Sequence, residues 1–140
     1  MEQVLSQELL RRVVDVFYAR VREDDLLGPI FESAVHDWPE HLVKLTNFWA
    51  RVMLGATDYA GNPMIAHAKH SDRIMPAHFE RWLVLWSEVT DSVLPIALAR
   101  PLQERAAQMA RGLSAGVEGA RRGLDPALIA YQRRGAPAAG

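Results

Sequence analysis

The 140-residue chain contains no cysteine. This absence excludes disulfide bonds, zinc sites built on thiolates, iron–sulfur clusters and cysteine nucleophiles. Any metal in the protein must therefore bind to histidine or carboxylate side chains.

The chain also lacks a clear excess of charge of one sign. Sixteen Lys and Arg residues face seventeen Asp and Glu residues, for a formal net charge of -1. Such a balance produces no global field that would attract nucleic acid or an anionic membrane.

Long uncharged hydrophobic runs are absent too. No run reaches the roughly 18 residues that a membrane-spanning helix needs. The first residues, MEQVLSQELL, show no basic segment followed by an apolar stretch, which a secretory signal would require. We therefore expect a cytoplasmic protein.

Several catalytic signatures are missing as well: a glycine-rich phosphate loop, a serine-centred elbow and a pair of carboxylates in a catalytic arrangement. Hydrolase and kinase functions are therefore unsupported. What is present is 49% hydrophobic and 24% charged residues, which is typical of an ordinary globular protein. The length predicts one domain with a substantial core and room for a small ligand.

Helical periodicity dominates the first half of the chain. Apolar residues at three- and four-residue spacings predict a helix over residues 5–21, with Ser6 or Gln3 at its start. Residues 23–31 combine acidic residues, glycine and proline, which predicts a turn. A second helix is expected from near Trp38 to about Leu54.

The second half begins with an expected loop over residues 55–63 and a short segment, 64–70, that carries two histidines. An apolar stripe predicts a helix from just after Pro76 to Val93, which Pro95 bends or ends. Pro101 is expected to open the last long helix. With no pair of strands in the pattern, the sequence predicts an all-α domain.

Three polar side chains lie on otherwise apolar helix faces. His41 shares a stripe with Leu45, Phe48 and Trp49, and Tyr18 and Trp82 lie on inward faces of two other helices. Each one alone is most simply explained by core packing. Together, the three could converge on one ligand atom inside an apolar cavity.

Two histidines of the middle segment are candidate metal ligands. His67 and His70 are three residues apart and could bind a divalent ion together with a carboxylate such as Asp72. A single histidine can instead hold heme iron. His36 and His78, near helix starts, receive no functional role.

Five segments of the chain carry a family resemblance: FYARVR at 17–22, LGPIF at 27–31, HLVKLTNFW at 41–49, YAGNP at 59–63 and HFERWL at 78–83. With these segments, the sequence resembles group III truncated hemoglobins from about residue 5 to 117. The resemblance implies a truncated globin fold in which a two-over-two helical sandwich encloses heme b. It implies a globin domain over 1–122 and a C-terminal extension, a short helix or a flexible tail, over 123–140.

The resemblance also implies the site residues. His67, four residues after Pro63, corresponds to the proximal iron ligand. This chain departs from the family at His70, where an apolar residue is common, and the additional imidazole makes His70 the alternative ligand. Tyr18, His41 and Trp82 correspond to the distal, ligand-binding side. The remaining pocket residues that it implies are Phe17, Phe31, Lys44, Leu45, Phe48, Trp49 and Met64, with Lys44 near a heme propionate.

The function implied is that of a heme b protein that binds O₂, NO and CO. Hydrogen bonds from the three distal residues would slow O₂ release, which suits redox chemistry or NO or peroxide detoxification better than transport. Activity as an NO dioxygenase or peroxidase would need a separate reductase, because the chain carries no flavin or nicotinamide motif. His41 could act as a gate or as a sixth iron ligand. The alternative function is a heme-free helical module that binds a divalent metal or a partner.

Overall fold

The computed structural model describes residues 4–56 and 74–123. Within these two ranges the secondary structure consists of helices, with no strand. The helices are α1 (Gln7–Glu23), α2 (Gly28–Ala34), α3 (Trp38–Leu54), α5 (Pro76–Val93) and α6 (Ile96–Arg121). The predicted all-α class is confirmed.

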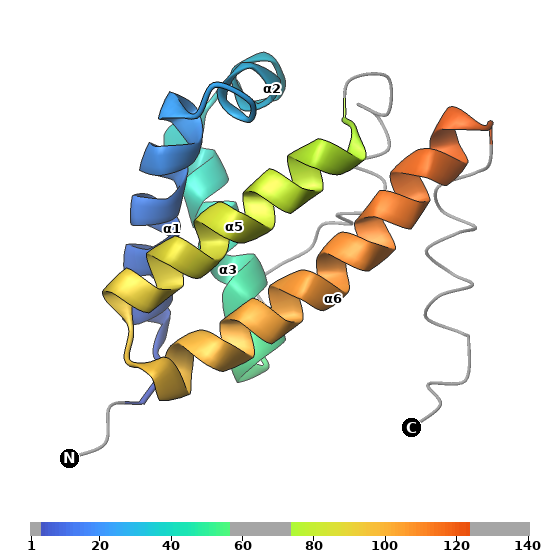
Figure 1. The fold of residues 1–140 in the computed structure, drawn as a ribbon. Helices are drawn as coiled ribbons and strands as arrows, with labels where there is room; N and C mark the ends of the chain where they lie inside the picture. Colours follow the sequence, from blue (N-terminus) through green and yellow to red (C-terminus); the bar gives the residue numbers. More distant parts are fainter. Residues whose placement is uncertain (1–3, 57–73, 124–140) are drawn as a thin grey trace, which may run out of the picture.

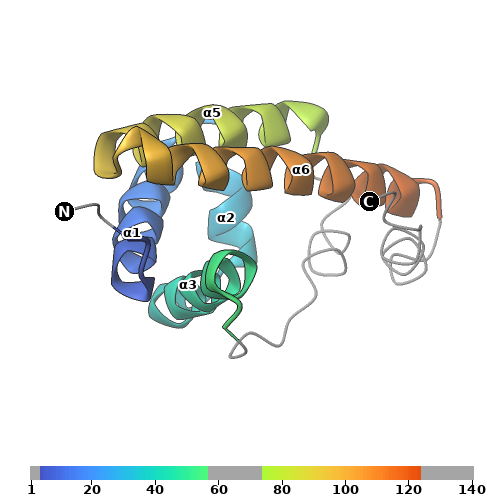
Figure 2. The same ribbon diagram turned by 90° about the horizontal axis from the view of Figure 1, so that it is seen from below.

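The helices form two layers (Figures 1 and 2). Helices α5 and α6 lie side by side and antiparallel in one layer, and α1 and α3 form the other, joined by the short α2. Helix α1 is central, because it packs against α2, α3 and α5, while α6 packs against α5. The core therefore lies between the two layers, where α1 contacts α3 of its own layer and α5 of the other.

Helix α1 begins at the serine that the sequence suggested. The Ser6 hydroxyl accepts a hydrogen bond from the Leu9 amide at 3.2 Å, which satisfies one of the unpaired donors of the first turn. The side chains Leu10, Val13, Phe17 and others of this face are fully buried. Of the two predicted starting residues, Ser6 is the correct one.

Helix α2 corrects the prediction of a turn over residues 23–31. Gly28 and Pro29, which signalled a break, stand in the first turn of a seven-residue helix, where proline is well tolerated because its missing N–H would be unpaired anyway. A Cβ atom at Gly28 would lie 2.9 Å from the carbonyl oxygen of Arg22. Glycine therefore permits α2 to start close against the end of α1.

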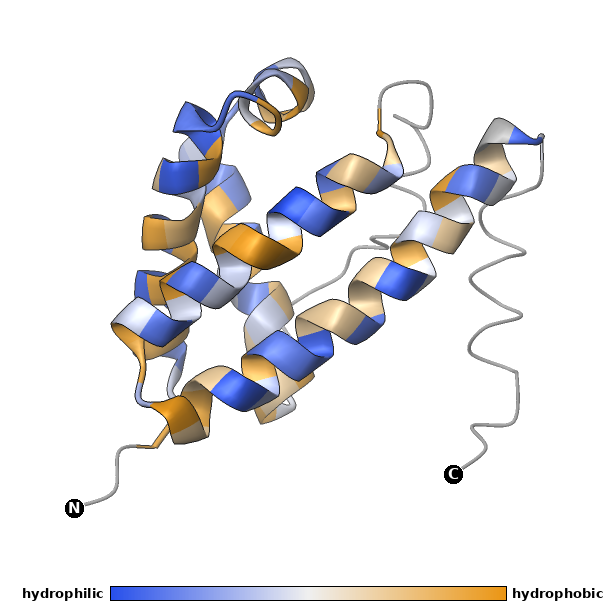
Figure 3. Ribbon diagram, in the orientation of Figure 1, coloured by the Kyte–Doolittle hydropathy of each residue, from blue (hydrophilic) through white to orange (hydrophobic). Residues whose placement is uncertain are grey.

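Helix α6 corrects a second prediction, because it begins at Ile96 rather than at Pro101. Pro95 precedes the first residue, and Pro101 lies inside the helix. Ala99 and Leu102, on either side of Pro101, are fully buried, so tertiary packing outweighs the one backbone hydrogen bond that proline removes. Figure 3 shows hydrophobic and hydrophilic residues alternating along both α5 and α6.

Buried polar contacts fix α5 against α6. The Trp86 indole N–H donates to the Leu102 carbonyl oxygen at 3.2 Å. The Thr90 hydroxyl donates to the Trp86 carbonyl oxygen at 2.8 Å and accepts from the Gln103 amide at 2.9 Å. These pairs satisfy buried polar groups that would otherwise destabilise the core.

The corner between α1 and α2 is built on Asp24, whose side chain is 7% exposed. One carboxylate oxygen accepts from Arg81 Nε of α5 at 2.8 Å, and the other accepts from the Leu26 and Leu27 amides at 3.1 and 2.9 Å. Burial by itself would raise the pKa of Asp24, but the Leu27 amide and the Arg81 guanidinium together hold this pKa below its ordinary value. The carboxylate thus joins three helices.

We expect the Asp24→Asn variant to be less stable by about 1–2 kcal/mol at pH 7, because a neutral amide is a weaker acceptor for Arg81. Since the folded pKa is lowered, the contribution of the carboxylate is present above its unfolded pKa of roughly 4 and is lost as the pH falls through the folded value. The measurement is the free energy of unfolding in urea of the wild type and of Asp24→Asn, at a series of pH values from 7 to about 3. A stability difference that does not narrow with falling pH would contradict the assignment.

No helix in the described part of the chain is long and apolar enough to cross a membrane. The extension predicted for residues 123–140 lies, after Gly123, outside the described residues. The domain division at residue 122 therefore stays a prediction.

Candidate functional site

Tyr18 lies at the centre of an aromatic cluster on the buried face of α1. Its side chain is 5% exposed, and its ring centroid lies 4.8 Å from Phe17, 5.5 Å from Phe31 and 5.9 Å from His41. Residues from α1, α2 and α3 therefore meet around one phenol ring.

The Tyr18 hydroxyl is hydrogen-bonded to the side chain of Trp82. An indole N–H can only donate, so the phenol oxygen is the acceptor. Burial raises the pKa of Tyr18 far above its ordinary value, and the bond from Trp82 offsets only part of this rise. The hydroxyl thus stays protonated, and its own proton is available to a further acceptor.

Trp82 is held in place by other aromatic rings of the core. Its ring lies nearly parallel to Trp86, with centroids 5.7 Å apart and an interplanar angle of 4°. Phe17 meets Trp82 edge-on at 5.7 Å. Trp86 stacks in turn on Trp49 of α3 at 4.6 Å. Stacking of this kind leaves the indole of Trp82 little freedom to turn.

His41 of α3 completes the polar part of the cluster. Its side chain is half-buried, and its Nε2 atom is buried. The imidazole meets Tyr18 edge-on at 86°. The structure therefore brings together Tyr18, Trp82 and His41, the three polar residues that sequence periodicity had placed on inward helix faces.

Trp38 belongs to the same cluster, and sequence analysis missed it. Its ring centroid lies 5.6 Å from His41 and 6.0 Å from Tyr18, and the Arg22 guanidinium lies 4.6 Å from the ring centroid. Its Nε1 atom is buried without a hydrogen-bond partner among the described residues. The available signal was spacing, because Trp38 precedes His41 by three residues and so shares its helix face.

The other predicted pocket residues fall into three groups. Phe17 and Trp49 are buried in the core. Phe31, Leu45 and Phe48 are partly buried and pack against that core. Lys44 is exposed, with its Nζ atom 4.0 Å from the Glu40 carboxylate. The structure thus places Phe17 and Phe31 against Tyr18 and the other described apolar residues in or against the common core.

Four residues of the hypotheses lie outside the described residues: Met64, His67, His70 and Asp72. Within 4–56 and 74–123, no three His, Asp or Glu side chains gather in a way that could hold a metal ion. His36 is exposed, and His78 Nδ1 accepts a hydrogen bond from the Met75 amide at 2.8 Å, at the start of α5.

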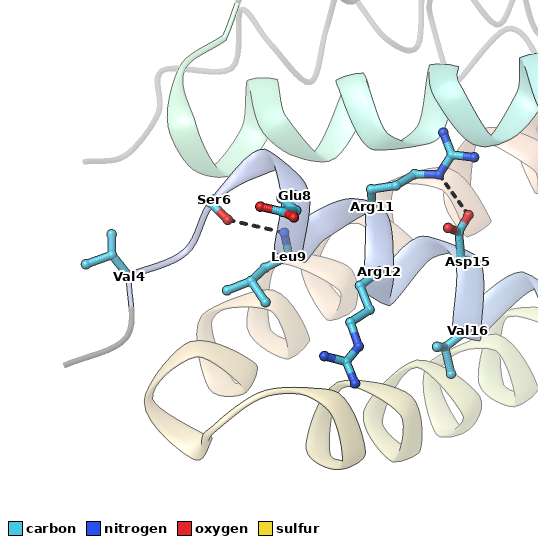
Figure 4. Close-up of a pocket in the computed structure, with 8 residues that line it drawn as sticks. All are labelled: Val4, Ser6, Glu8, Leu9, Arg11, Arg12, Asp15 and Val16. Carbon is cyan, nitrogen blue, oxygen red and sulfur yellow. Dashed lines mark hydrogen bonds and ion pairs between the residues drawn. The ribbon is translucent and has the colours of Figure 1, made fainter. Parts of the chain in front are cut away.

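A hollow on the molecular surface lies apart from this cluster (Figure 4). It has a volume of about 590 Å³ and opens along the first half of α1, where Ser6, Leu9, Arg12 and Val16 contribute to its lining. None of the clustered aromatic residues lines it. Its lining mixes the apolar side chains Val4, Leu9 and Val16 with charged ones such as Arg12 and Asp15.

Comparison with solved structures identifies the class of fold. The crystal structure of the group III truncated hemoglobin from Campylobacter jejuni matches this one with a TM-score of 0.74 and 34% sequence identity. The match covers 83% of this chain and 94% of that chain. The two layers of helices described above are therefore those of a truncated globin fold.

Sequence comparison leads to the family. The group 3 truncated hemoglobin ctb of Campylobacter jejuni is 35% identical over 114 residues, which is 77% of this chain and 87% of that protein. The family model for bacterial-like globins matches residues 1–114. The chain belongs to the bacterial-like globin family. Membership implies heme binding and, with it, the binding of diatomic gases.

The described residues fit such a cofactor. A flat porphyrin needs large apolar side chains around it, and a small ligand at its iron needs donors that are shielded from water. The described residues offer both, because the ring of Phe31 lies 5.5 Å from the protonated Tyr18 phenol and partly buried Leu45 and Phe48 pack against the same core. The buried Nε1 atom of Trp38, which has no partner in the described part of the chain, is a further donor that an added acceptor could satisfy.

Proposed function

We propose that the protein binds heme b and holds a diatomic ligand against the buried polar side chains Tyr18, His41 and Trp82, with Trp82 acting through the Tyr18 hydroxyl to which its N–H donates. The observation that carries this proposal is the buried Tyr18 hydroxyl, which accepts from Trp82 and stays protonated. A phenol that already accepts one hydrogen bond is a stronger donor for the next, because hydrogen bonds in a chain polarise one another.

His67 is the proposed proximal ligand, with His70 as the alternative. Heme, when bound through one histidine, would supply an iron that can bind a small gas molecule. Phe17, Phe31, Leu45, Phe48, Trp49 and Met64 would form the apolar surroundings that exclude water. The exposed Lys44 would pair with a propionate, a contact open to it because its present partner, Glu40, is 4.0 Å away.

The donors favour retention of O₂ over its rapid release. Each hydrogen bond in a dry pocket contributes about 1–3 kcal/mol to holding an oxygen that carries partial negative charge, more as that charge grows. Slow release suits reaction of the held O₂ with NO, or the consumption of peroxide, better than O₂ transport. Repeated turnover would require electrons from a separate reductase. A cytoplasmic location stays a prediction.

The second candidate is the heme-free helical module, which would use His67, His70 and Asp72 for a divalent metal or would bind a partner. The family match favours the heme protein.

Titration of the purified chain with hemin tests the proposal. We expect an intense Soret band that saturates at one heme per chain and that shifts when the reduced protein is exposed to CO. The same chain unfolded in urea, titrated in parallel, controls for loose hemin adsorption, which gives no defined end point at one heme per chain. Absence of a saturable Soret band would contradict the heme hypothesis and would make metal analysis the next measurement.

A further inference from the structure

Trp38 forms the boundary between the aromatic cluster and the surface. On one side its ring contacts Tyr18, Phe31 and His41, with centroids 6.0, 6.4 and 5.6 Å away. On the other side lies the Arg22 guanidinium, 4.6 Å from the ring centroid. Arg22 is about half exposed and pairs with Glu32 at 3.4 Å. A cation over an aromatic ring stabilises the ring in that position.

The indole N–H of Trp38 differs from those of two other tryptophans in the cluster. Trp82 donates to the Tyr18 hydroxyl, and Trp86 donates to the Leu102 carbonyl oxygen. The Nε1 atom of Trp38 is buried and has no partner within the described ranges. A buried donor without an acceptor destabilises a fold, so a position that retains one favours an acceptor beyond the described residues, such as a bound ligand.

We propose that Trp38 is a further hydrogen-bond donor of the ligand pocket, available to the bound diatomic ligand, and that Arg22 is the positioning residue that holds its indole. This inference rests on the proposed function. Two observations support it: Trp38 contacts both Tyr18 and His41, which are proposed to face the ligand, and its N–H is buried with no acceptor among the described residues.

The Trp38→Phe variant tests the donor. Phenylalanine keeps an aromatic ring against Tyr18, His41 and Arg22 but removes the N–H. In the hemin-loaded, reduced protein we expect O₂ to dissociate about 2- to 10-fold faster, the range of one neutral hydrogen bond. We also expect a higher C–O stretching frequency in the CO complex, because loss of a donor near the ligand oxygen strengthens the C–O bond.

Arg22→Gln tests the positioning role, and Arg20→Gln is its matched control. Arg20 lies on the same helix and pairs with Glu88 at 2.8 Å on the surface, outside the cluster. We expect Arg22→Gln to move both measurements in the same direction as Trp38→Phe, by a smaller amount, and Arg20→Gln to leave them unchanged. This comparison also decides the question if Trp38→Phe does not fold.

The outcomes separate this inference from the proposed function. If Tyr18→Phe changes O₂ release and the C–O stretch while Trp38→Phe and Arg22→Gln change neither, Trp38 is not a donor to the ligand and the heme proposal stands. If the wild-type chain takes up no hemin, both proposals are wrong.

Discussion

The His67→Gly variant is expected to bind heme at least about 100-fold more weakly than the wild type, and added imidazole is expected to restore binding. The substitution removes the proposed iron ligand itself. Loss of a residue that only hydrogen-bonds to a metal ligand already weakens metal binding by about 10- to 100-fold. The missing side chain leaves a space in which free imidazole can take its place. The measurement is the absorption spectrum of the reduced, deoxygenated protein with and without imidazole.

His70→Gly is the matched control, because it removes the same side chain three residues away. We expect this variant to keep the spectrum of the wild type. If His70→Gly loses the Soret band and His67→Gly retains it, the ligand assignment is wrong, although membership of the globin family is unaffected.

The Tyr18→Phe variant is expected to release O₂ roughly 10- to 100-fold faster, the range for a hydrogen bond to a group that carries charge. Burial raises the pKa of Tyr18 and keeps its hydroxyl protonated, so in the wild type the donor is present at neutral pH. The measurement is the O₂ dissociation rate of the reduced protein by stopped-flow mixing with CO. An unchanged rate would falsify the role of the hydroxyl.

Trp82→Phe separates the two members of this hydrogen-bonded pair. It leaves the Tyr18 hydroxyl in place but removes the N–H that it accepts. We expect the increase in O₂ release to be smaller than in Tyr18→Phe, because the phenol can still donate. A larger increase would show that Trp82 itself is the main donor to the ligand.

Several elements were predictable because they depend on local rules. The start of α1 follows from the ability of Ser6 to accept a hydrogen bond from the first turn. The approach of Tyr18, His41 and Trp82 follows from helical periodicity, which places polar residues on the same face as their buried neighbours. The remaining condition, that these faces point at one another, was met by the packing of α1 against α3 and α5.

Other elements depend on contacts that a local pattern does not contain. Proline is typical of a helix boundary. Pro29 does lie at one, in the first turn of α2, whereas Pro101 lies inside α6. Which role a proline takes is decided by what its neighbours bury. The position of the Trp38 ring depends on Arg22, which belongs to another helix. His67 and His70 lie outside the described residues, so their roles stay predictions.

The hydrogen bond between Arg81 and Asp24 contributes to the stability of the fold and also fixes the orientation of α5 about its own axis. Successive residues of an α-helix point about 100° apart around the axis, so anchoring Arg81 at the corner of α1 and α2 also sets the direction in which Trp82 projects. That direction brings the Trp82 indole to the Tyr18 hydroxyl. A substitution at the partly exposed Arg81 is therefore expected to change the direction of the Trp82 indole, and with it the hydrogen bond to Tyr18.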